Sequence, residues 1–231
     1  MPGGGVPGSG MSGDGMPGDG VPGSGMEFGG ALISADFEPV FRVSRIADSD
    51  FRRIDGISWK PDCPVPQGDL RLLSITHFGF DGRAHTGELI CHYKVADELA
   101  EIFKELYDAG FQIEKIRLID EYGADDLLSM EDNNTSAFNY RTVSGTSNLS
   151  KHAYGLAIDI NPIQNPYVEG GGDYVSPEAG REYLDRGDVR PGMITPGSAA
   201  HTAFMSRGWT WGGNWKYQID YQHFQKAVEL G

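Results

Sequence analysis

Two short segments of this chain each combine a histidine with an aspartate, and they limit the folds that the chain can adopt. The first segment, residues 150–159, places His152 and Asp159 seven positions apart. The second, residues 220–224, places His223 three positions after Asp220. Two imidazoles and one carboxylate are a typical ligand set for a catalytic zinc ion, which keeps its fourth position open. A fold that uses this set must bring the two segments together.

We expect His152, Asp159 and His223 to hold one zinc ion (Zn2+) per chain. A lone histidine is more often a structural or surface residue than a ligand, so this hypothesis depends on the joint pattern. Gly155 and Ala157 separate the first two ligands, and such small residues let a chain turn closely around an ion. The remaining acid of the second segment would stay outside the coordination shell.

The order of these residues resembles the M15 family of zinc peptidases. The first segment matches that family's Ser-x-His-x-x-Gly-x-Ala-x-Asp pattern at Ser150, His152, Gly155, Ala157 and Asp159. The second matches its closing Asp-x-x-His-Phe, and WGGNW at 211–215 is similar to the Trp-Gly-Gly-x-Trp that precedes it. The resemblance implies a peptidase of peptidoglycan stem peptides, either a D-Ala-D-Ala carboxypeptidase or an L-Ala-D-Glu endopeptidase.

The resemblance also implies catalytic and substrate-binding residues. Asp220 would act as general base and then as general acid, or, alternatively, would only orient His223. Arg141 precedes the first histidine by a short interval, like the arginine that the family places at the substrate. Its fork of N–H donors suits a carboxylate, although a surface arginine paired with an acid is the alternative. Ser150 either binds substrate or ends a loop, and His85 could line the substrate cleft.

The same resemblance leaves a second class of function open. The family fold is α+β, with a small antiparallel sheet carrying the zinc site and helices packed on one side. Hedgehog-type signalling domains resemble this fold, keep zinc and do not act as peptidases. A non-catalytic zinc-containing binding module on the same scaffold is therefore the alternative, and the acid at Asp220 favours the enzyme.

Hydrophobic patterning predicts a hairpin followed by a helix. Residues 70–80 alternate apolar and polar side chains as a strand does, and residues 87–93 form the returning strand after a turn at 81–82. Apolar residues at helical spacing predict a helix over 95–109, with Gly110 as its stop signal. Residues 113–120 alternate again, so we expect a further strand there.

The second half of the chain is predicted as follows. Residues 121–149 form a long polar segment, which in a compact domain indicates a functional loop. A short buried strand at 157–160 directs Asp159 inward, and residues 161–197 are expected to form an extended loop at the rim of the cleft. Residues 198–207 predict a helix with Ser198 as N-cap, and a final strand carries His223.

Residues 1–30 differ in composition from the rest of the chain. They contain five-residue repeats, including VPGSG at 6–10 and 21–25 and MPGDG at 16–20. Such Pro/Gly-rich sequence cannot bury enough apolar surface to offset the entropy of ordering, so we expect a disordered tail. Residues 31–231 should then form a single domain.

Composition and charge restrict the classes of binding partner and the cellular location that we expect for this chain. The net charge of −14 argues against a nucleic-acid partner, and no stretch is apolar enough to span a membrane. The N-terminus lacks the charged and apolar regions of a signal peptide, so the localisation stays open for an enzyme that would act on the cell wall.

The remaining cysteines and histidines leave two further questions open. Cys63 and Cys91 could form a disulfide or remain free. A second metal site at His77, His85 and His92 is a weaker hypothesis, because alternation along a hairpin would separate them.

Overall fold

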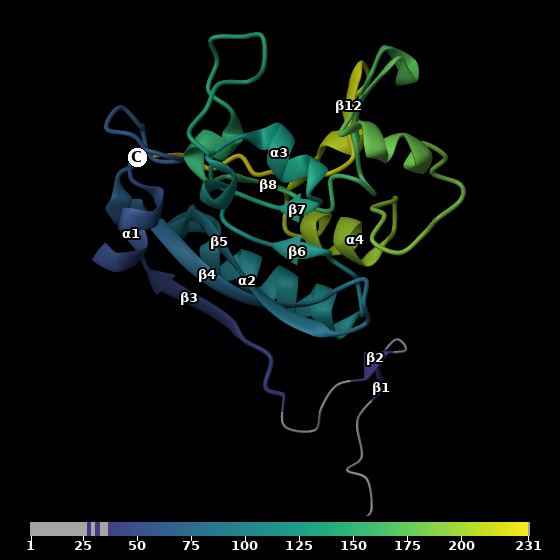
Figure 1. Cartoon of the computed structure of the whole chain (residues 1–231), viewed down its shortest axis with the longest axis horizontal. Coiled ribbons are helices and arrows are strands. Elements are labelled where there is room, and N and C mark those ends of the chain that lie inside the picture. Colours follow the sequence, from purple (N-terminus) through teal and green to yellow (C-terminus); the bar gives the residue numbers. More distant parts are fainter. Residues whose placement is uncertain (1–26, 29–30, 33–36, 231) are drawn as a thin grey trace, which may run out of the picture.

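The structure is a computed structural model of the 231-residue chain. It describes the backbone of residues 27–28 and 31–32, and residues 37–230 in full. The first two pairs form β1 (Glu27–Phe28) and β2 (Ala31–Leu32), which are antiparallel. Most of the predicted tail at 1–30 lies outside the described residues, so the division at residue 30 stays a prediction. Figure 1 shows the arrangement of the elements.

A three-stranded antiparallel sheet supports the rest of the fold. It consists of β3 (Phe41–Arg45), β4 (Leu70–Phe78) and β5 (Ala84–His92), in the order β3-β4-β5. The predicted hairpin of β4 and β5 is confirmed, and β5 begins three residues earlier than expected. Leu73 and Ile75 belong to one apolar cluster, whereas Leu70 and Leu72 belong to another. Successive side chains of a strand face opposite sides, so β4 is covered on both faces.

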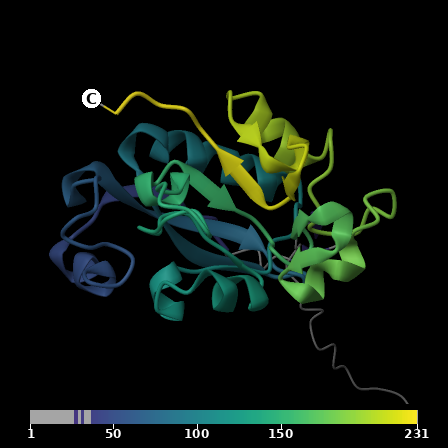
Figure 2. The same cartoon turned by 90° about the horizontal axis from the view of Figure 1, so that it is seen from above.

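The helix α2 (Tyr93–Asp108) covers one face of this sheet, and α4 (Ala199–Met205) packs against α2. The predicted helix is confirmed as α2, which begins directly after β5 and ends before Gly110, whose φ is +67°. The helix α4 has the predicted N-cap, because the hydroxyl of Ser198 accepts a hydrogen bond from the backbone N–H of His201. Figure 2 shows α2 and α4 side by side, and both contribute to the larger apolar cluster. The opposite face packs against the end of α1 (Asp48–Ile54).

Short strands carry the C-terminal half of the chain. One antiparallel sheet has the order β11-β13-β8, formed by β11 (Thr210–Trp211), β13 (His223–Gln225) and β8 (Ala157–Asp159). It is joined to the first sheet through the segment at 136–138. Ser136 forms a bridge with Asp159, and the N–H of Phe138 donates to the carbonyl of Ile90 on β5. The mixture of helices and small antiparallel sheets confirms the α+β class.

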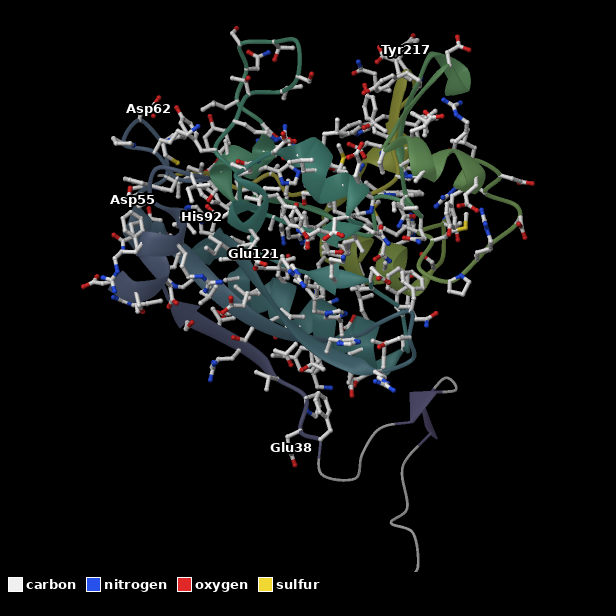
Figure 3. The ribbon with its side chains drawn as sticks, viewed as in Figure 1. Glu38, Asp55, Asp62, His92, Glu121 and Tyr217 are labelled. Atoms are coloured by element: carbon white, nitrogen blue, oxygen red, sulfur yellow. The ribbon has the colours of Figure 1, made fainter. Side chains whose placement is uncertain are left out.

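A further small sheet corrects the expectation of an extended loop at 161–197. Here β9 (Tyr167–Glu169) pairs with β10 (Tyr174–Ser176) on one side and with β12 (Gln218–Asp220) on the other. Two 3-10 helices, Gly170–Gly172 and Glu178–Tyr183, lie in the same stretch. Tyr217 precedes β12 and is 88% exposed, projecting from the outer end of this sheet (Figure 3).

The strand expected at 113–120 is largely wrong. Only β6 (Lys115–Ile116) is a strand, paired in parallel with β7 (Asn134–Thr135), and a 3-10 helix follows at Ile119–Tyr122. The backbone N–H of Glu114 donates to the side chain of Asn161, and that of Arg117 donates to the side chain of Asn134. These side-chain amides take donors that a longer strand would offer to a neighbour, so the ladder stops after two residues.

The stretch at 121–149 is also more regular than expected, since it contains α3 (Asp126–Glu131) as well as β7.

The two cysteines do not form a disulfide. Cys63 is half-buried and Cys91 is buried, and both are free thiols. No helix in the described residues has the length and the apolar character needed to cross a membrane.

Candidate metal centre

The pairing of β8 with β13 builds the first half of the site. Asp159 and His223 are register partners, as are Ile158 and Phe224 one position further along. Because side chains alternate along a strand, Ile158 and Phe224 point into the core, where both are fully buried. Asp159 and His223 therefore share the opposite face, and Oδ1 of Asp159 lies 2.9 Å from Nδ1 of His223.

A 3-10 turn, Lys151–Tyr154, supplies the third side chain. The hydroxyl of Ser150 caps this turn by accepting a hydrogen bond from the N–H of His152 at 3.3 Å. Gly155 ends the turn with φ +63°, and a Cβ there would lie 2.6 Å from the backbone nitrogen of His92. The glycine thus lets the turn rest directly on the end of β5, which places His152 beside the strand pair.

Hydrogen bonds at the outer edge of each imidazole set its tautomer. Nδ1 of His152 donates to the carbonyl of Ala137, which leaves the lone pair of Nε2 facing the centre. Nε2 of His223 lies 3.2 Å from Oε1 of Gln225 and donates there, so Nδ1, which faces Asp159, becomes available to a metal ion once it has lost its proton. These are the tautomers that metal coordination requires.

The three inner ligand atoms fit a tetrahedral metal ion. Nε2 of His152 lies 3.2 Å from Nδ1 of His223 and 3.1 Å from Oδ2 of Asp159. Ligands of a tetrahedral zinc ion lie about 3.3 Å from one another, given bonds of about 2.0–2.1 Å. Two imidazole lone pairs this close repel each other unless a proton or a cation lies between them. His152, Asp159 and His223 therefore form a group that could hold a metal ion, called the metal group below.

The charges of the cluster shift its pKa values strongly. Burial alone would raise the pKa of Asp159, but the two adjacent imidazoles hold it well below its usual range. Burial alone would lower the pKa of His223, but Asp159 raises it to about 9. The carboxylate of Asp159 and the imidazole of His223 therefore stabilise each other's charged forms.

Asp220 stands next to this cluster at the end of β12. Burial, and then the charge of Asp159, raise the pKa of its carboxyl to about 7. The backbone of Asp220 packs closely against the WGGNW segment at 211–215. A Cβ at Gly212 in that segment would lie 2.5 Å from the carbonyl oxygen of Asp220, so only glycine fits there. In the same segment, the ring of Trp215 lies 5.5 Å from that of His223, centroid to centroid. This segment therefore packs around both members of the Asp-x-x-His pair.

The other predicted site residues are placed differently. Arg141 forms an ion pair with Asp126, and its charge lowers the pKa of Asp220, so it lies within electrostatic reach of the site. Ser150 is buried and caps the turn of His152, as described above. The structure does not bring His85 to the site. Its imidazole pairs with Asp81 at 3.0 Å near the hairpin turn.

The far position of His85 follows from the geometry of β5. The other end of that strand, His92, donates its backbone N–H to Gly155 in the turn of the site. The two histidines are seven positions apart along the strand, a distance of about 23 Å. His77 and His85 are register partners with ring centroids 5.7 Å apart, so the expectation that the hairpin would separate these two is wrong. His92 does lie apart from them, and among the described residues these three histidines form no metal-binding group.

Two contributors to the site were missing from the sequence analysis. Gln225 lies two positions after His223 on the same strand face, so period-two alternation could have indicated it. The carbonyl of Ala137 has no side-chain signature, and only the tertiary fold shows that it orients His152.

The fold and the site together define an α+β protein with a His–Asp–His group suited to a metal ion and an acid beside it. The M15 peptidase family model described as D-alanyl-D-alanine carboxypeptidase matches residues 144–226. This stretch includes His152, Asp159, Asp220 and His223, and the match supports a peptidase of the M15 type. Searches of curated proteins and of solved structures gave no match.

Proposed function

We propose that the protein is a zinc-dependent peptidase that hydrolyses peptidoglycan stem peptides. The observation that carries this proposal is the convergence of two imidazole nitrogens and one carboxylate next to the buried acid Asp220. The match to a family model of D-alanyl-D-alanine carboxypeptidases supports the D-Ala-D-Ala carboxypeptidase type. An L-Ala-D-Glu endopeptidase stays within the proposal, because the geometry of the metal group is independent of which bond is cut.

One zinc ion per chain would be held by Nε2 of His152, Nδ1 of His223 and the carboxylate of Asp159. Zinc in such a site supplies Lewis acidity, which polarises the scissile carbonyl and makes a water molecule more acidic. The chain's own contribution is to hold the three donors at fixed positions, through the β8–β13 register and the capped turn at His152.

Asp220 would move the proton. As a carboxylate it accepts a proton from the attacking water, and as an acid it gives that proton to the amine that leaves when the peptide bond breaks. Its raised pKa supports this role, because a group that titrates near neutral pH can both take and release a proton there. A second possibility is that Asp220 only orients His223.

Arg141 would bind the substrate directly, whereas Ser150 would position the metal ligand His152. Arg141 would bind a carboxylate of the stem peptide, since its guanidinium offers several N–H donors in one plane. The hydroxyl of Ser150 already caps the turn of His152, which supports a positioning role for this residue. His85 lies outside the proposed substrate site, because its ion pair with Asp81 holds it at the hairpin turn.

Digestion of purified muropeptides by the purified protein, with products identified by mass, tests the proposal. We expect loss of a terminal D-Ala or cleavage after L-Ala, abolition by a zinc chelator, and recovery on addition of zinc but not of magnesium. A protein that holds stoichiometric zinc and leaves every muropeptide intact would instead support the alternative, a non-catalytic zinc-containing binding module.

A further inference from the structure

The guanidinium of Arg141 is held by α3 within electrostatic reach of Asp220. Its Nε, which is buried, forms an ion pair with Oδ2 of Asp126, the first residue of that helix, and makes no hydrogen bond among the described residues. Its Nη1 donates to the neighbouring carbonyl of Thr142 at 3.4 Å, and within the described part of the chain Nη2 has no acceptor. One edge of the guanidinium is therefore fixed by the protein, and donors remain for a ligand.

Asp126 is itself anchored rather than free at the surface. Its other oxygen, Oδ1, accepts a hydrogen bond of 2.9 Å from Nδ2 of Asn139. Asn139 is only 3% exposed, and the same nitrogen also donates to the carbonyl of Ala124. The carboxylate of Asp126 is thus held on both sides, by the amide and by Arg141.

The backbone of Asn139 extends this connection to the metal group. Its N–H donates to the carbonyl of His152 at 3.2 Å. A continuous set of contacts therefore runs from the turn of His152 through Asn139 and Asp126 to the guanidinium of Arg141. An ordinary exposed ion pair contributes little and leaves both side chains mobile, whereas this pair is tied to a buried amide.

We propose that Asp126 is a positioning residue that fixes the guanidinium of Arg141 relative to the metal group, so that its free donors meet a carboxylate of the substrate. The expected loss of kcat/KM rests on the proposed peptidase function. The fixed position of the guanidinium does not rest on it. Asn139 is the link that sets the position of Asp126. The class of ligand is a peptide with a free carboxylate, since a planar fork of donors matches that group best.

Kinetics of the zinc-loaded protein test the consequence for substrate. Asp126→Asn removes the charge that holds Nε, so kcat/KM for a carboxylate-bearing stem peptide should fall by about 10- to 100-fold, mostly through KM. The same peptide with its carboxylate amidated should lose much less. Glu131→Gln is the matched control, because it removes one negative charge from the same helix at a side chain that makes no ion pair or hydrogen bond among the described residues.

A double-mutant cycle separates positioning from a general effect on the fold. If Asp126 acts through Arg141, Asp126→Asn should have no further effect in an Arg141→Ala background. Equal losses in both backgrounds would overturn the proposal. So would an equal loss in Glu131→Gln.

The NMR signal of the Nε–H group of Arg141, identified by its disappearance in Arg141→Lys, tests the structural part without any turnover. We expect a signal protected from exchange with water in the parent and in Glu131→Gln, and one that exchanges at least tenfold faster in Asp126→Asn. An unchanged signal in Asp126→Asn overturns the inference. A changed signal in a protein that cleaves no muropeptide supports the positioning and refutes the proposed function.

Discussion

Asp159 and His223 face each other across the β8–β13 pair, with Oδ1 and Nδ1 2.9 Å apart. A shift of this register by one residue would turn His223 toward the core and Phe224 toward the site. The stacked rings of Phe224 and Phe204, 4.2 Å apart at their centroids, oppose such a shift because they bury Phe224 completely. Core packing on one face of the strand thus determines the metal-binding geometry on the other.

Gly155→Ala should harm the site far more than Gly145→Ala. Both glycines have positive φ, +63° and +72°, so each substitution carries about 1–2 kcal/mol of backbone strain. Only at Gly155 would the new methyl group also meet backbone, 2.6 Å from the nitrogen of His92, whereas nothing lies within 4 Å at Gly145. Urea unfolding and zinc titration of both variants measure the difference. Equal losses of stability and of zinc affinity would refute this account of the turn.

His152→Ala and His223→Ala should each lose both zinc and peptidase activity, because two protein ligands hold zinc poorly. His85→Ala should keep both, since its imidazole pairs with Asp81 away from the metal group. Metal analysis after dialysis, together with turnover, checks the three variants. Full zinc occupancy in either of the first two would disprove the ligand assignment, and a loss of turnover in His85→Ala would return that residue to the substrate site.

The two segments that carry the site were predictable, because the ligand chemistry restricts the residue types and their spacing. The helix α2 was predictable from its apolar period, since its buried face packs on the sheet. The strand expected at 113–120 is mostly absent because of contacts with distant parts of the chain. Its backbone donors are taken by Asn134 and Asn161, whose side chains arrive from distant parts of the chain. The pairing of Arg141 with Asp126 likewise depends on the fold and has no local pattern.

Zinc affinity should rise with pH between 6 and 8. In the metal-free protein the pKa of His223 is raised to about 9, so its imidazole is protonated in this range and must lose a proton to coordinate. Affinity should therefore increase by up to about tenfold per pH unit for that one proton. Calorimetry in two buffers with different protonation enthalpies measures the release, and no proton release at pH 7 would contradict the assignment.

The same shift predicts how the metal-free protein's stability depends on pH. A raised pKa in the folded state means that the protonated His223 stabilises the fold. That contribution is fully present below about pH 6.5 and is lost as the pH rises through about 9. His223→Gln should remove this part of the pH dependence, as measured by urea unfolding with a chelator present.

Arg141→Lys should slow turnover while leaving the zinc content unchanged. Lysine keeps the positive charge but loses the planar fork that can bind a carboxylate through two parallel hydrogen bonds. We expect kcat/KM to fall by about tenfold or more for a carboxylate-bearing peptide, and less for its amidated form. Parent kinetics in this variant would assign Arg141 to the surface ion pair alone.

Asp220→Asn distinguishes a peptidase from a zinc-binding module. Asparagine keeps the size of the side chain but cannot accept a proton from water at neutral pH. Turnover of muropeptides and zinc content should be measured on the same sample. The rate should fall by about 10²- to 10⁴-fold with one zinc ion still bound per chain. Cleavage at the parent rate with zinc in place would contradict this expectation.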